Sequence, residues 1–251
     1  MIFTLFNVKI YIMKKIILWD LDGTILNFQK AEYGAIKKCF QILNLGCCSD
    51  EMVDHYNKIN IKWWEALERN EYTKKEILIN RFVEFFEFYH IDIQYAKQFN
   101  DLYQVTLGDF VYFMDYALDT LLTLKKENYI QCVITNGTKI AQTKKLNISK
   151  LINVFDYIFI SEDVGYEKPN PQFISEVMKK INHYNKDEMI IIGDSLTSDI
   201  LLGNNTSIET IYYNPEGKPN NKNIHYDYEI KDLRDVIKIV KNTTKKDINN
   251  L

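Results

Sequence analysis

Two aspartates stand close together at the end of an apolar run, in the sequence DLDGT at residues 20–24. The run itself, residues 15–19, is predicted to be a buried strand, and Gly23 permits the backbone to turn directly after it. Asp20 and Asp22 held close in such a turn repel each other unless a cation neutralises them. Oxygen ligands, with a phosphate expected beside them, favour Mg²⁺ as that cation. The alternative is an aspartate-rich turn that binds water or caps a helix.

Three further polar groups follow apolar segments. Residues 135–137 (TNG) offer a hydroxyl, an amide and free N–H groups that can hold phosphate oxygens, or they form a simple Asn-Gly turn. Lys168, in the segment KPNP at 168–171, can neutralise an anion or belong to a solvated loop. Asp194, in GDS at 193–195, can bind a metal or cap the following helix. Because all four groups stand at the ends of predicted strands, together they predict one polar site.

The polar site requires a sheet that brings the strand ends together. From residue 116 onward, predicted helices alternate with further strands, and the predicted strands are 129–135, 157–160, 189–193 and 210–213. This alternation indicates an α/β fold with a parallel sheet that is covered on both faces.

A segment with a different hydrophobic pattern interrupts this alternation after the first strand. Apolar and aromatic residues recur there at helical spacing, over about 29–44, 50–69, 74–89 and 93–105. We therefore predict a discontinuous core domain at 1–27 and 107–251, interrupted by an all-helical cap at 28–106. An insertion at this point lies beside the edge where α/β sheets bind ligands, so it is placed to act as a lid.

The composition of the whole chain excludes several classes of protein. The 251 residues include 31 basic and 34 acidic side chains, a formal net charge of −3, and 46% are hydrophobic. This balance argues against binding to a nucleic-acid polymer, and the 9 Gly and 4 Pro argue against collagen-like or Gly/Pro-rich disordered chains. No apolar run reaches the roughly 18–20 residues that a membrane span needs, so no membrane partner is expected.

The cysteines and the first residues bear on location. Four cysteines show no metal-type spacing, and the neighbours Cys47 and Cys48 are poorly placed for a mutual disulfide, so we expect reduced thiols in a cytoplasmic protein. The apolar segment 1–13 has no basic residues before its apolar part and no small-residue cleavage site, which argues against a signal peptide. Met13 resembles a natural start, which would make residues 1–12 an upstream extension. The chain is expected to be a monomer or a weak homodimer.

The four polar motifs, in this order, resemble those of the haloacid dehalogenase (HAD) superfamily of phosphohydrolases. The matching segments are DLDGT (20–24), ITNG (134–137), KP (168–169) and GDSLTSD (193–199). The resemblance covers essentially residues 13–240 and implies a Rossmann-like core with a helical cap of the C1 type. It also implies Mg²⁺ as cofactor and a small phosphorylated metabolite as substrate.

The resemblance assigns catalytic roles to three residues. Asp20 is expected to be the nucleophile that forms an aspartyl-phosphate, and Asp22 the general acid and base. Lys168 is expected to stabilise the nucleophile and the phosphoryl group. Dehalogenases of this superfamily lack the second acid and the metal, so the presence of Asp22 disfavours cleavage of carbon–halogen bonds.

Binding roles follow from the same resemblance. Thr135 and Asn136 are expected to hold the phosphate. Asp194 is expected to bind Mg²⁺ together with Asp20 and the backbone carbonyl of Asp22. Asp199 is expected to lie in the outer shell of the metal rather than to bind it directly.

Within the superfamily, the segments 160–174 and 193–215 resemble nucleotidases of the YjjG/YfnB type, and the cap segment 57–82 resembles them loosely. This resemblance implies a nucleoside 5'-monophosphatase that favours pyrimidine and noncanonical nucleotides. The alternatives are a phosphoglycolate or sugar-phosphate phosphatase, an enzyme like β-phosphoglucomutase, and a catalytically silent binding module with a HAD fold.

Three cap residues are candidates for contact with the substrate. Arg81 could reach a polar end of the substrate, and Trp63 or Trp64 could stack on a base. The interpretation we favour is that the aromatic residues pack the helices of the cap and that Arg81 forms a salt bridge.

Overall fold

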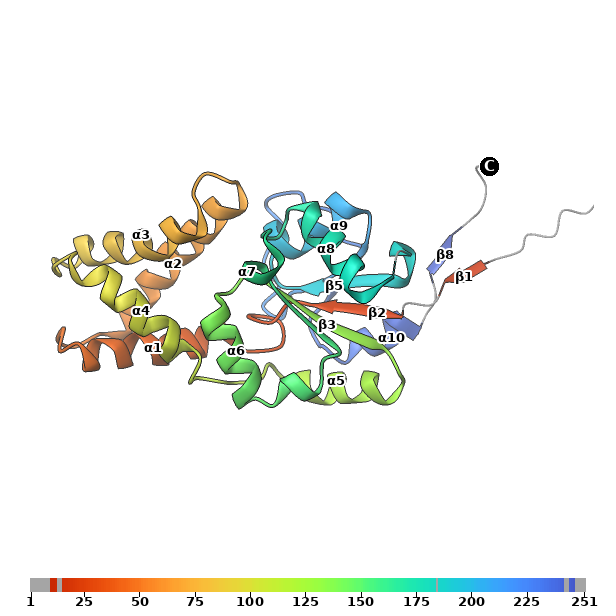
Figure 1. Cartoon of the computed structure of the whole chain (residues 1–251), viewed down its shortest axis with the longest axis horizontal. Coiled ribbons are helices and arrows are strands. Elements are labelled where there is room, and N and C mark those ends of the chain that lie inside the picture. The colour runs from red at the N-terminus through yellow and green to blue at the C-terminus, as the bar shows by residue number, and fades with distance from the viewer. Residues whose placement is uncertain (1–9, 13–14, 184, 242–243, 247–251) are drawn as a thin grey trace, which may run out of the picture.

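The computed structural model describes residues 10–12, 15–183, 185–241 and 244–246. Its centre is a sheet of six parallel strands in the order β4-β3-β2-β5-β6-β7 (Figure 1). The strands are β2 (Ile16–Trp19), β3 (Ile130–Thr135), β4 (Tyr157–Ile160), β5 (Met189–Gly193), β6 (Glu209–Tyr213) and β7 (Tyr228–Ile230). The predicted α/β fold with a parallel sheet is confirmed.

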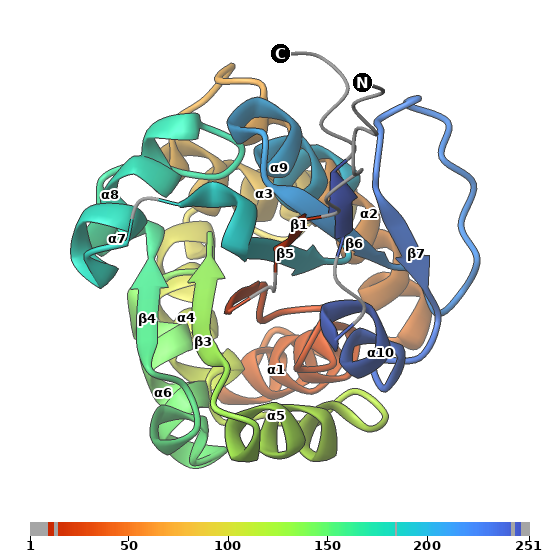
Figure 2. The ribbon, with the colours of Figure 1, turned by 90° about the vertical axis from the view of Figure 1, so that its right-hand side faces the viewer.

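Helices cover both faces of the sheet, as its uninterrupted apolar strands require. On one face, Ile17 and Trp19 pack with side chains of α5, α6 and α10. On the other face, Ile16 and Leu18 pack with side chains of α8 and α9 (Figure 2). The bounds of these helices are α5 (Ala117–Lys126), α6 (Lys139–Ile148), α8 (Pro171–Ile181), α9 (Leu201–Thr206) and α10 (Asp235–Lys241).

Four more helices form a lobe of their own beside the sheet (Figure 1). They are α1 (Phe28–Ile42), α2 (Asp50–Glu68), α3 (Lys74–Phe88) and α4 (Tyr95–Leu107). Buried rings hold the lobe together, and Phe99 lies 5.5 Å from Phe40 and 4.9 Å from Phe82 between ring centroids. The predicted all-helical cap is confirmed, and we use the word cap for this lobe. The predicted domain boundaries after residues 27 and 106 stay predictions.

Several elements differ from the sequence prediction. The helix that follows β5 begins with a π-helical turn at Leu196–Ile200, which continues into α9 and which the alternation of helices and strands did not predict. The short helix α7 (Ser161–Val164) and strand β7 were not predicted, because three or four residues are too few to show a hydrophobic period.

The ends of the chain contribute little to this architecture. Outside the main sheet, β1 (Ile10–Ile12) pairs antiparallel with β8 (Thr244–Lys246) at the end of the molecule away from the cap (Figure 1). The expectations about a signal peptide and about an extension over residues 1–12 concern mostly residues outside the described part of the chain. Within that part, no helix combines the length and apolar character needed to cross a membrane.

Two adjacent chain segments join the cap to the core. The Asn27 amide donates to the Tyr112 carbonyl at 2.7 Å, and the Met114 amide donates to the Ile25 carbonyl at 2.9 Å. Leu26 forms an antiparallel bridge with Phe113 between these two bonds. The outgoing and returning connections are therefore paired to each other like the strands of a short ribbon.

A buried polar network lies inside the cap. The Glu32 carboxylate, on a residue that is 1% exposed, accepts hydrogen bonds from the Asn57 and Asn60 amides at 2.7 and 2.8 Å. The Arg81 guanidinium donates to Asn60 Oδ1 at 2.7 Å and to Asn100 Oδ1 at 3.3 Å. Among the described residues Arg81 thus makes hydrogen bonds to amides, and the expected salt bridge is absent. Burial raises the pKa of Glu32 to about 7, although Asn57 and the charge of Arg81 oppose this rise.

Replacing Glu32 by glutamine is expected to remove one source of pH dependence from the stability of the protein. The folded protein holds the Glu32 proton up to about pH 7, whereas the unfolded chain releases it near the ordinary value of 4.5. Because the folded state binds more protons in this window, the free energy of unfolding falls as pH rises from 4.5 to 7, by on the order of 3 kcal/mol. Urea unfolding at pH 5 and pH 8 should show a smaller fall for Glu32→Gln than for the wild type.

The matched control for this prediction is Glu51→Gln, at an exposed position of α2. This variant should show the same fall as the wild type. An equal fall in all three proteins would contradict the burial penalty assigned to Glu32.

Candidate active site

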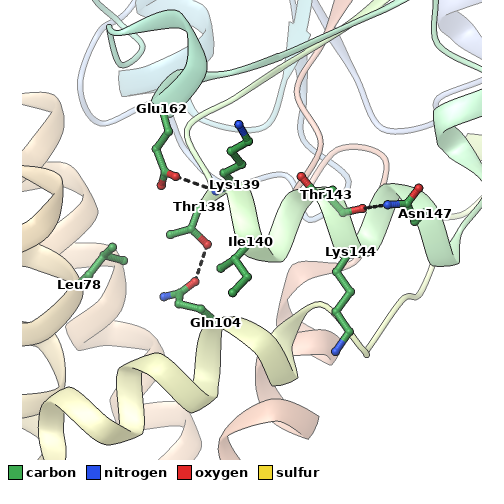
Figure 3. Close-up of a pocket in the computed structure, with 9 residues that line it drawn as sticks. All are labelled: Leu78, Gln104, Thr138, Lys139, Ile140, Thr143, Lys144, Asn147 and Glu162. Carbon is green, nitrogen blue, oxygen red and sulfur yellow. Dashed lines mark hydrogen bonds between the residues drawn. The ribbon is translucent and has the colours of Figure 1, made fainter.

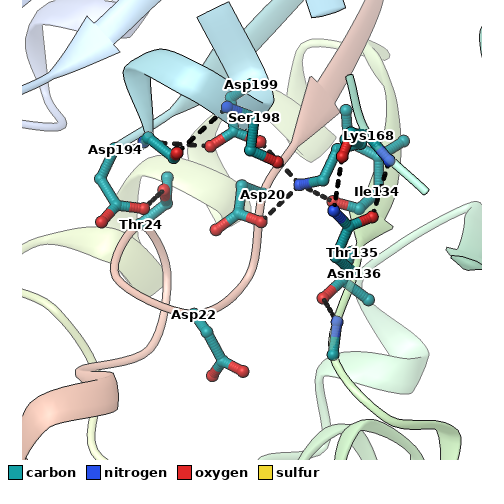
Figure 4. Close-up of polar contacts among 12 residues, drawn as sticks. Asp20, Asp22, Thr24, Ile134, Thr135, Asn136, Lys168, Asp194, Ser198 and Asp199 are labelled. Carbon is teal, nitrogen blue, oxygen red and sulfur yellow. Dashed lines mark hydrogen bonds and ion pairs between the residues drawn. The ribbon is translucent and has the colours of Figure 1, made fainter. Parts of the chain in front are cut away.

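The carboxyl ends of the central strands bring the predicted polar motifs together (Figure 4). Asp20 follows β2, Thr135 ends β3, and Asp194 follows β5. Lys168 reaches them from the loop between α7 and α8. Its buried Nζ donates to Asp20 Oδ1 at 2.7 Å, to Asp199 Oδ1 at 2.6 Å and to the Ile134 carbonyl at 2.8 Å. One lysine thus connects the ends of three segments that lie far apart in the sequence.

Three carboxylates surround this lysine. Oxygen atoms of Asp20, Asp194 and Asp199 all lie within 4.8 Å of one another. Burial raises the pKa of Asp20 well above its ordinary value, and the two other carboxylates add to this rise while Lys168 opposes it. Burial, with Asp199 beside it, also raises the pKa of Asp194 to about 7. The single ammonium group therefore leaves an excess of negative charge in a buried place.

This cluster fits a divalent cation. The Oδ2 atom of Asp20 is buried and has no hydrogen-bond partner, which is costly for a carboxylate oxygen away from water. Asp194 accepts one bond, from the Thr24 hydroxyl at 3.2 Å. Hard oxygen donors with a net negative charge are the ligands that Mg²⁺ prefers. One such ion would give the unpaired Asp20 oxygen a partner and would also neutralise the excess of negative charge.

Two glycines allow the carboxylates to approach. Gly23 has a φ of +99°, and a Cβ atom at this position would lie 2.3 Å from Asp194 Oδ2. A Cβ atom at Gly193 would lie 2.2 Å from the Cγ atom of Asp199. The predicted turn at Gly23 is therefore present, and both glycines also leave room for a carboxylate.

The sequence left two roles open for the GDS segment, metal binding and capping of the next helix. In the π-helical turn after β5, different residues of the segment are available for the two roles. Ser195 caps the turn, since its Oγ accepts the Ser198 amide at 3.1 Å. Asp194 is thereby left free to face the cluster. The turn also brings Asp199 back toward Lys168, and the Ser195 amide donates to Asp199 Oδ2 at 3.2 Å. The predicted outer-shell role of Asp199 stays a prediction, although its carboxylate lies within the cluster itself.

The TNG segment makes contacts that the sequence did not predict. Asn136 Nδ2 donates to the Lys168 carbonyl, and the Lys168 amide donates to Asn136 Oδ1, both at 2.8 Å. The Thr135 hydroxyl accepts the Gly137 amide at 3.1 Å. In this structure Asn136 fixes the backbone that carries Lys168, and the phosphate-binding roles of Thr135 and Asn136 stay predictions.

Asp22 is placed apart from the cluster. Its side chain points away from Asp20 (Figure 4), and it accepts hydrogen bonds from Lys145 and Gln142 of α6. Neither residue was singled out in the sequence. The sequence holds one indication of their role. Gln142 and Lys145 lie on the buried face of α6 with Ala141 and Leu146, where polar side chains are unusual.

A cavity of about 570 Å³ lies between the cap and these strand ends. Asp20, Asp22 and Lys168 line its core side, together with the loop at 218–222. The cap contributes Trp64, Glu68, Arg81, Tyr103 and Gln104. Burial raises the pKa of Glu68, another residue that sequence reasoning missed, to about 7.

The two tryptophans of the cap have different surroundings. Trp64 lines the cavity, whereas the Trp63 indole donates to Glu84 at 2.8 Å and packs on Tyr72. The expectation that the aromatics pack the cap is therefore met by Trp63. Trp64 is the one of the pair that could contact a ligand.

Beside the cavity, α6 is tied to the cap. The Thr138 hydroxyl, at the start of α6, donates to Gln104 Oε1 of α4 at 2.6 Å (Figure 3). The neighbouring Lys139 amide donates to Glu162 at 3.1 Å (Figure 3). A shallow hollow opens at this junction and is lined in part by Leu78 and Ile140. Helix α6 is thus in contact with the cap as well as with the strand ends.

A parallel sheet with a buried lysine and carboxylates at its strand ends, beneath a helical cap, defines a class of hydrolases with Rossmann-like cores. The chain belongs to the haloacid dehalogenase-like hydrolase family, whose model matches residues 17–213. It is 33% identical to the HAD-hydrolase YfnB of Bacillus subtilis over 224 residues. This alignment covers 89% of this chain and 94% of YfnB.

Two further matches agree. The pyrimidine 5'-nucleotidase PynA of Streptococcus pneumoniae is 32% identical over 227 residues, which cover 89% of this chain and 93% of PynA. A crystal structure of Bacillus subtilis YfnB bound to magnesium has a TM-score of 0.85 at 32% identity, over 91% of this chain and 99% of that chain. The predicted HAD-family phosphatase with a Rossmann-like core is confirmed by these relatives.

Replacing Gly193 by alanine is expected to displace Asp199 and weaken its contact with Lys168. The added Cβ would meet both Cγ and Oδ2 of Asp199 at 2.2 Å, so the backbone or the carboxylate must move. We expect the free energy of unfolding to fall by about 1–3 kcal/mol, as for other overpacked positions. Urea unfolding of Gly193→Ala measures the loss.

Gly46→Ala is the control for this substitution. A Cβ atom at Gly46 would meet no atom within 4 Å, so only its φ of +90° opposes the change. A loss at Gly193 that does not exceed the loss at Gly46 would argue against the close approach of Asp199.

Proposed function

We propose that this chain is a Mg²⁺-dependent phosphomonoester hydrolase that acts through an aspartyl-phosphate on pyrimidine or noncanonical nucleoside 5'-monophosphates. The observation that carries the proposal is the bond from buried Lys168 to Asp20, with the free Oδ2 of Asp20 beside two more carboxylates. A carboxylate held in this way is oriented as a nucleophile and is relieved of part of its repulsion from a phosphate. We also propose that the protein acts in the cytoplasm.

The reaction proceeds in two displacements at phosphorus. An oxygen of Asp20 forms a bond to phosphorus while the bond from phosphorus to the ester oxygen breaks, and Asp22 gives its proton to the departing oxygen. Water then attacks the aspartyl-phosphate, and Asp22 takes the proton of that water. Inorganic phosphate leaves and the Asp20 carboxylate is restored, so that each group ends as it began.

The binding groups of the chain prepare both displacements. Lys168 neutralises charge on Asp20 and on the phosphoryl group, and Thr135 and Asn136 would bind the phosphate oxygens. Asp20, Asp194 and the Asp22 backbone carbonyl would hold Mg²⁺, with Asp199 supporting them through Lys168. The bound ion would supply charge neutralisation between the phosphate and the carboxylates.

The walls of the cavity support a nucleoside as the leaving group. A volume of about 570 Å³ is within the range of sites for small ligands. Trp64 offers an aromatic face on which a base can stack, and Gln104 and Arg81 line the same space. The similarity to PynA, a pyrimidine 5'-nucleotidase, supports the same substrate class.

Phosphate release from a panel of esters tests this proposal. With Mg²⁺ present, UMP, dUMP or dTMP should be cleaved faster than phosphoglycolate or a hexose phosphate. A preference for phosphoglycolate or a hexose phosphate would overturn the nucleotidase assignment. A protein that folds, binds Mg²⁺ and cleaves none of these esters would favour a binding module instead.

The nucleophile is tested by Asp20→Asn. An amide oxygen is a poor nucleophile, so this variant should lose activity by about 10³-fold or more. Asp101→Asn, on the exposed side of α4, is the matched control and should keep the wild-type rate. If Asp20→Asn keeps most of its Mg²⁺-dependent activity, the nucleophile is a different group.

The affinity for Mg²⁺ should depend on pH through Asp194. Since the pKa of Asp194 is about 7 in the metal-free protein, a proton competes with the ion below that pH. Calorimetric titration with Mg²⁺ should show affinity about tenfold weaker at pH 6 than at pH 8. Asp194→Ala should bind more weakly at both pH values and show a smaller dependence, because the raised pKa of Asp20 remains. Unchanged binding by the variant would remove Asp194 from the set of ligands.

A further inference from the structure

The carboxylate of Asp22 is held by two side chains of α6. Lys145 Nζ lies 2.6 Å from Asp22 Oδ1 and 2.8 Å from Oδ2, and Gln142 Nε2 donates to Oδ2 at 2.7 Å. Both oxygens of this carboxylate therefore have a donor on the α6 side. The Asp22 side chain remains 18% exposed and lines the cavity, so its other side faces the place of the substrate.

The side chain of Lys145 is buried against Asp22. The residue is 0% exposed, and in the described part of the chain its Nζ makes hydrogen bonds only to Asp22. The ring of Phe28, with its centroid 5.3 Å from the Nζ atom, covers another side of the ammonium group. A buried ammonium group without a counterion is strongly destabilising, so Lys145 is expected to stay with Asp22 while Asp22 is ionised, the form in which it takes the proton of the attacking water.

The loop after β3 is shaped to let Gln142 reach Asp22. A Cβ atom at Gly137 would lie 1.7 Å from Gln142 Nε2, closer than any atoms can approach without a bond. The backbone φ of Gly137 is not positive, so the turn itself does not require glycine. The absence of a side chain at Gly137 thus serves the contact between α6 and Asp22.

The direction of the Asp22 side chain agrees with a role at the leaving group. In an in-line displacement, the leaving oxygen lies on the far side of phosphorus from the nucleophile. An acid that serves this oxygen must therefore stand apart from Asp20, across the width of the phosphoryl group. Asp22 points away from Asp20 (Figure 4) and still borders the cavity.

We propose that Lys145, assisted by Gln142, is a positioning residue that holds the Asp22 carboxylate at the leaving-group side of the cavity. This inference rests on the proposed function, in which Asp22 transfers protons. Lys145 itself touches neither substrate nor metal, and it acts by fixing where the carboxylate of Asp22 stands when the ester enters. A small displacement of such a group costs on the order of 10²-fold in rate.

Two esters that differ in their leaving group test the proposal. Departure of the ribose 5'-oxygen of UMP requires a proton from Asp22, whereas the nitrophenolate of 4-nitrophenyl phosphate departs without one. For Lys145→Met, kcat/KM on UMP should fall on the order of 10²-fold, while kcat/KM on 4-nitrophenyl phosphate should fall less than about threefold. A merely structural loss would lower both values by the same factor and would overturn the proposal, as would no loss on either ester.

Three further variants make the result decisive. Lys139→Met, at the exposed start of the same helix, should leave both rates unchanged. In an Asp22→Asn background, Lys145→Met should cost less than about twofold on UMP, because its effect passes through Asp22. Additive losses in this cycle would overturn the proposal. If Lys145→Met does not fold, Gln142→Met decides instead, with a loss of about fivefold or more on UMP alone expected.

Failure of this inference can be told apart from failure of the proposed function. A wild-type protein that releases phosphate from neither ester contradicts the proposed function, whatever Lys145 does. A wild-type protein that cleaves both esters, with a Lys145→Met variant that is slowed equally on both, contradicts only the role of Lys145.

Discussion

The ion cluster around Lys168 is the constraint on which the rest of the active edge depends. A buried ammonium group must have carboxylate partners, and here they come from the end of β2 and from the turn after β5. Asn136, directly after β3, fixes the backbone of the lysine through two hydrogen bonds. Removing Lys168 would leave the carboxylates of Asp20 and Asp199 buried without a counterion. The loops after the central strands are thus held together by charge and hydrogen bonding as well as by packing.

Much of this edge could be predicted from the sequence, because the relevant residues follow apolar strands directly. Asp20 and Asp194 are found together for that reason, since parallel strands that end at one edge must bring their next residues close, whereas Lys168 arrives from the loop between α7 and α8. The cap was predictable from the helical spacing of its aromatic residues. Both inferences use patterns that are local in the sequence.

The remainder of the site depends on contacts that no local pattern encodes. Lys145 and Gln142 lie on a helix whose orientation toward Asp22 is decided by tertiary packing. Glu68 reaches the cavity because it ends α2, beside the π-helical turn that carries Thr197. The pairing of Asn136 with the main chain of Lys168 joins residues 32 positions apart. Polar residues on the buried face of a helix indicate that such contacts exist, but they do not identify the partner.

The paired connections between cap and core have a mechanical consequence. A two-stranded ribbon bends easily across its plane, whereas twisting or shearing it would break the bonds from Asn27 to Tyr112 and from Met114 to Ile25. The paired connections are therefore expected to resist rotation of the cap about the long axis of the ribbon more than bending across its plane. Phe28 is the first residue of α1 and directly follows Asn27, so it lies beside this ribbon. Far from the paired connections along the chain, the ion pair between Glu65 of α2 and Lys222 of the core at 2.6 Å is a second link between cap and core, and it would have to break if the cap opened.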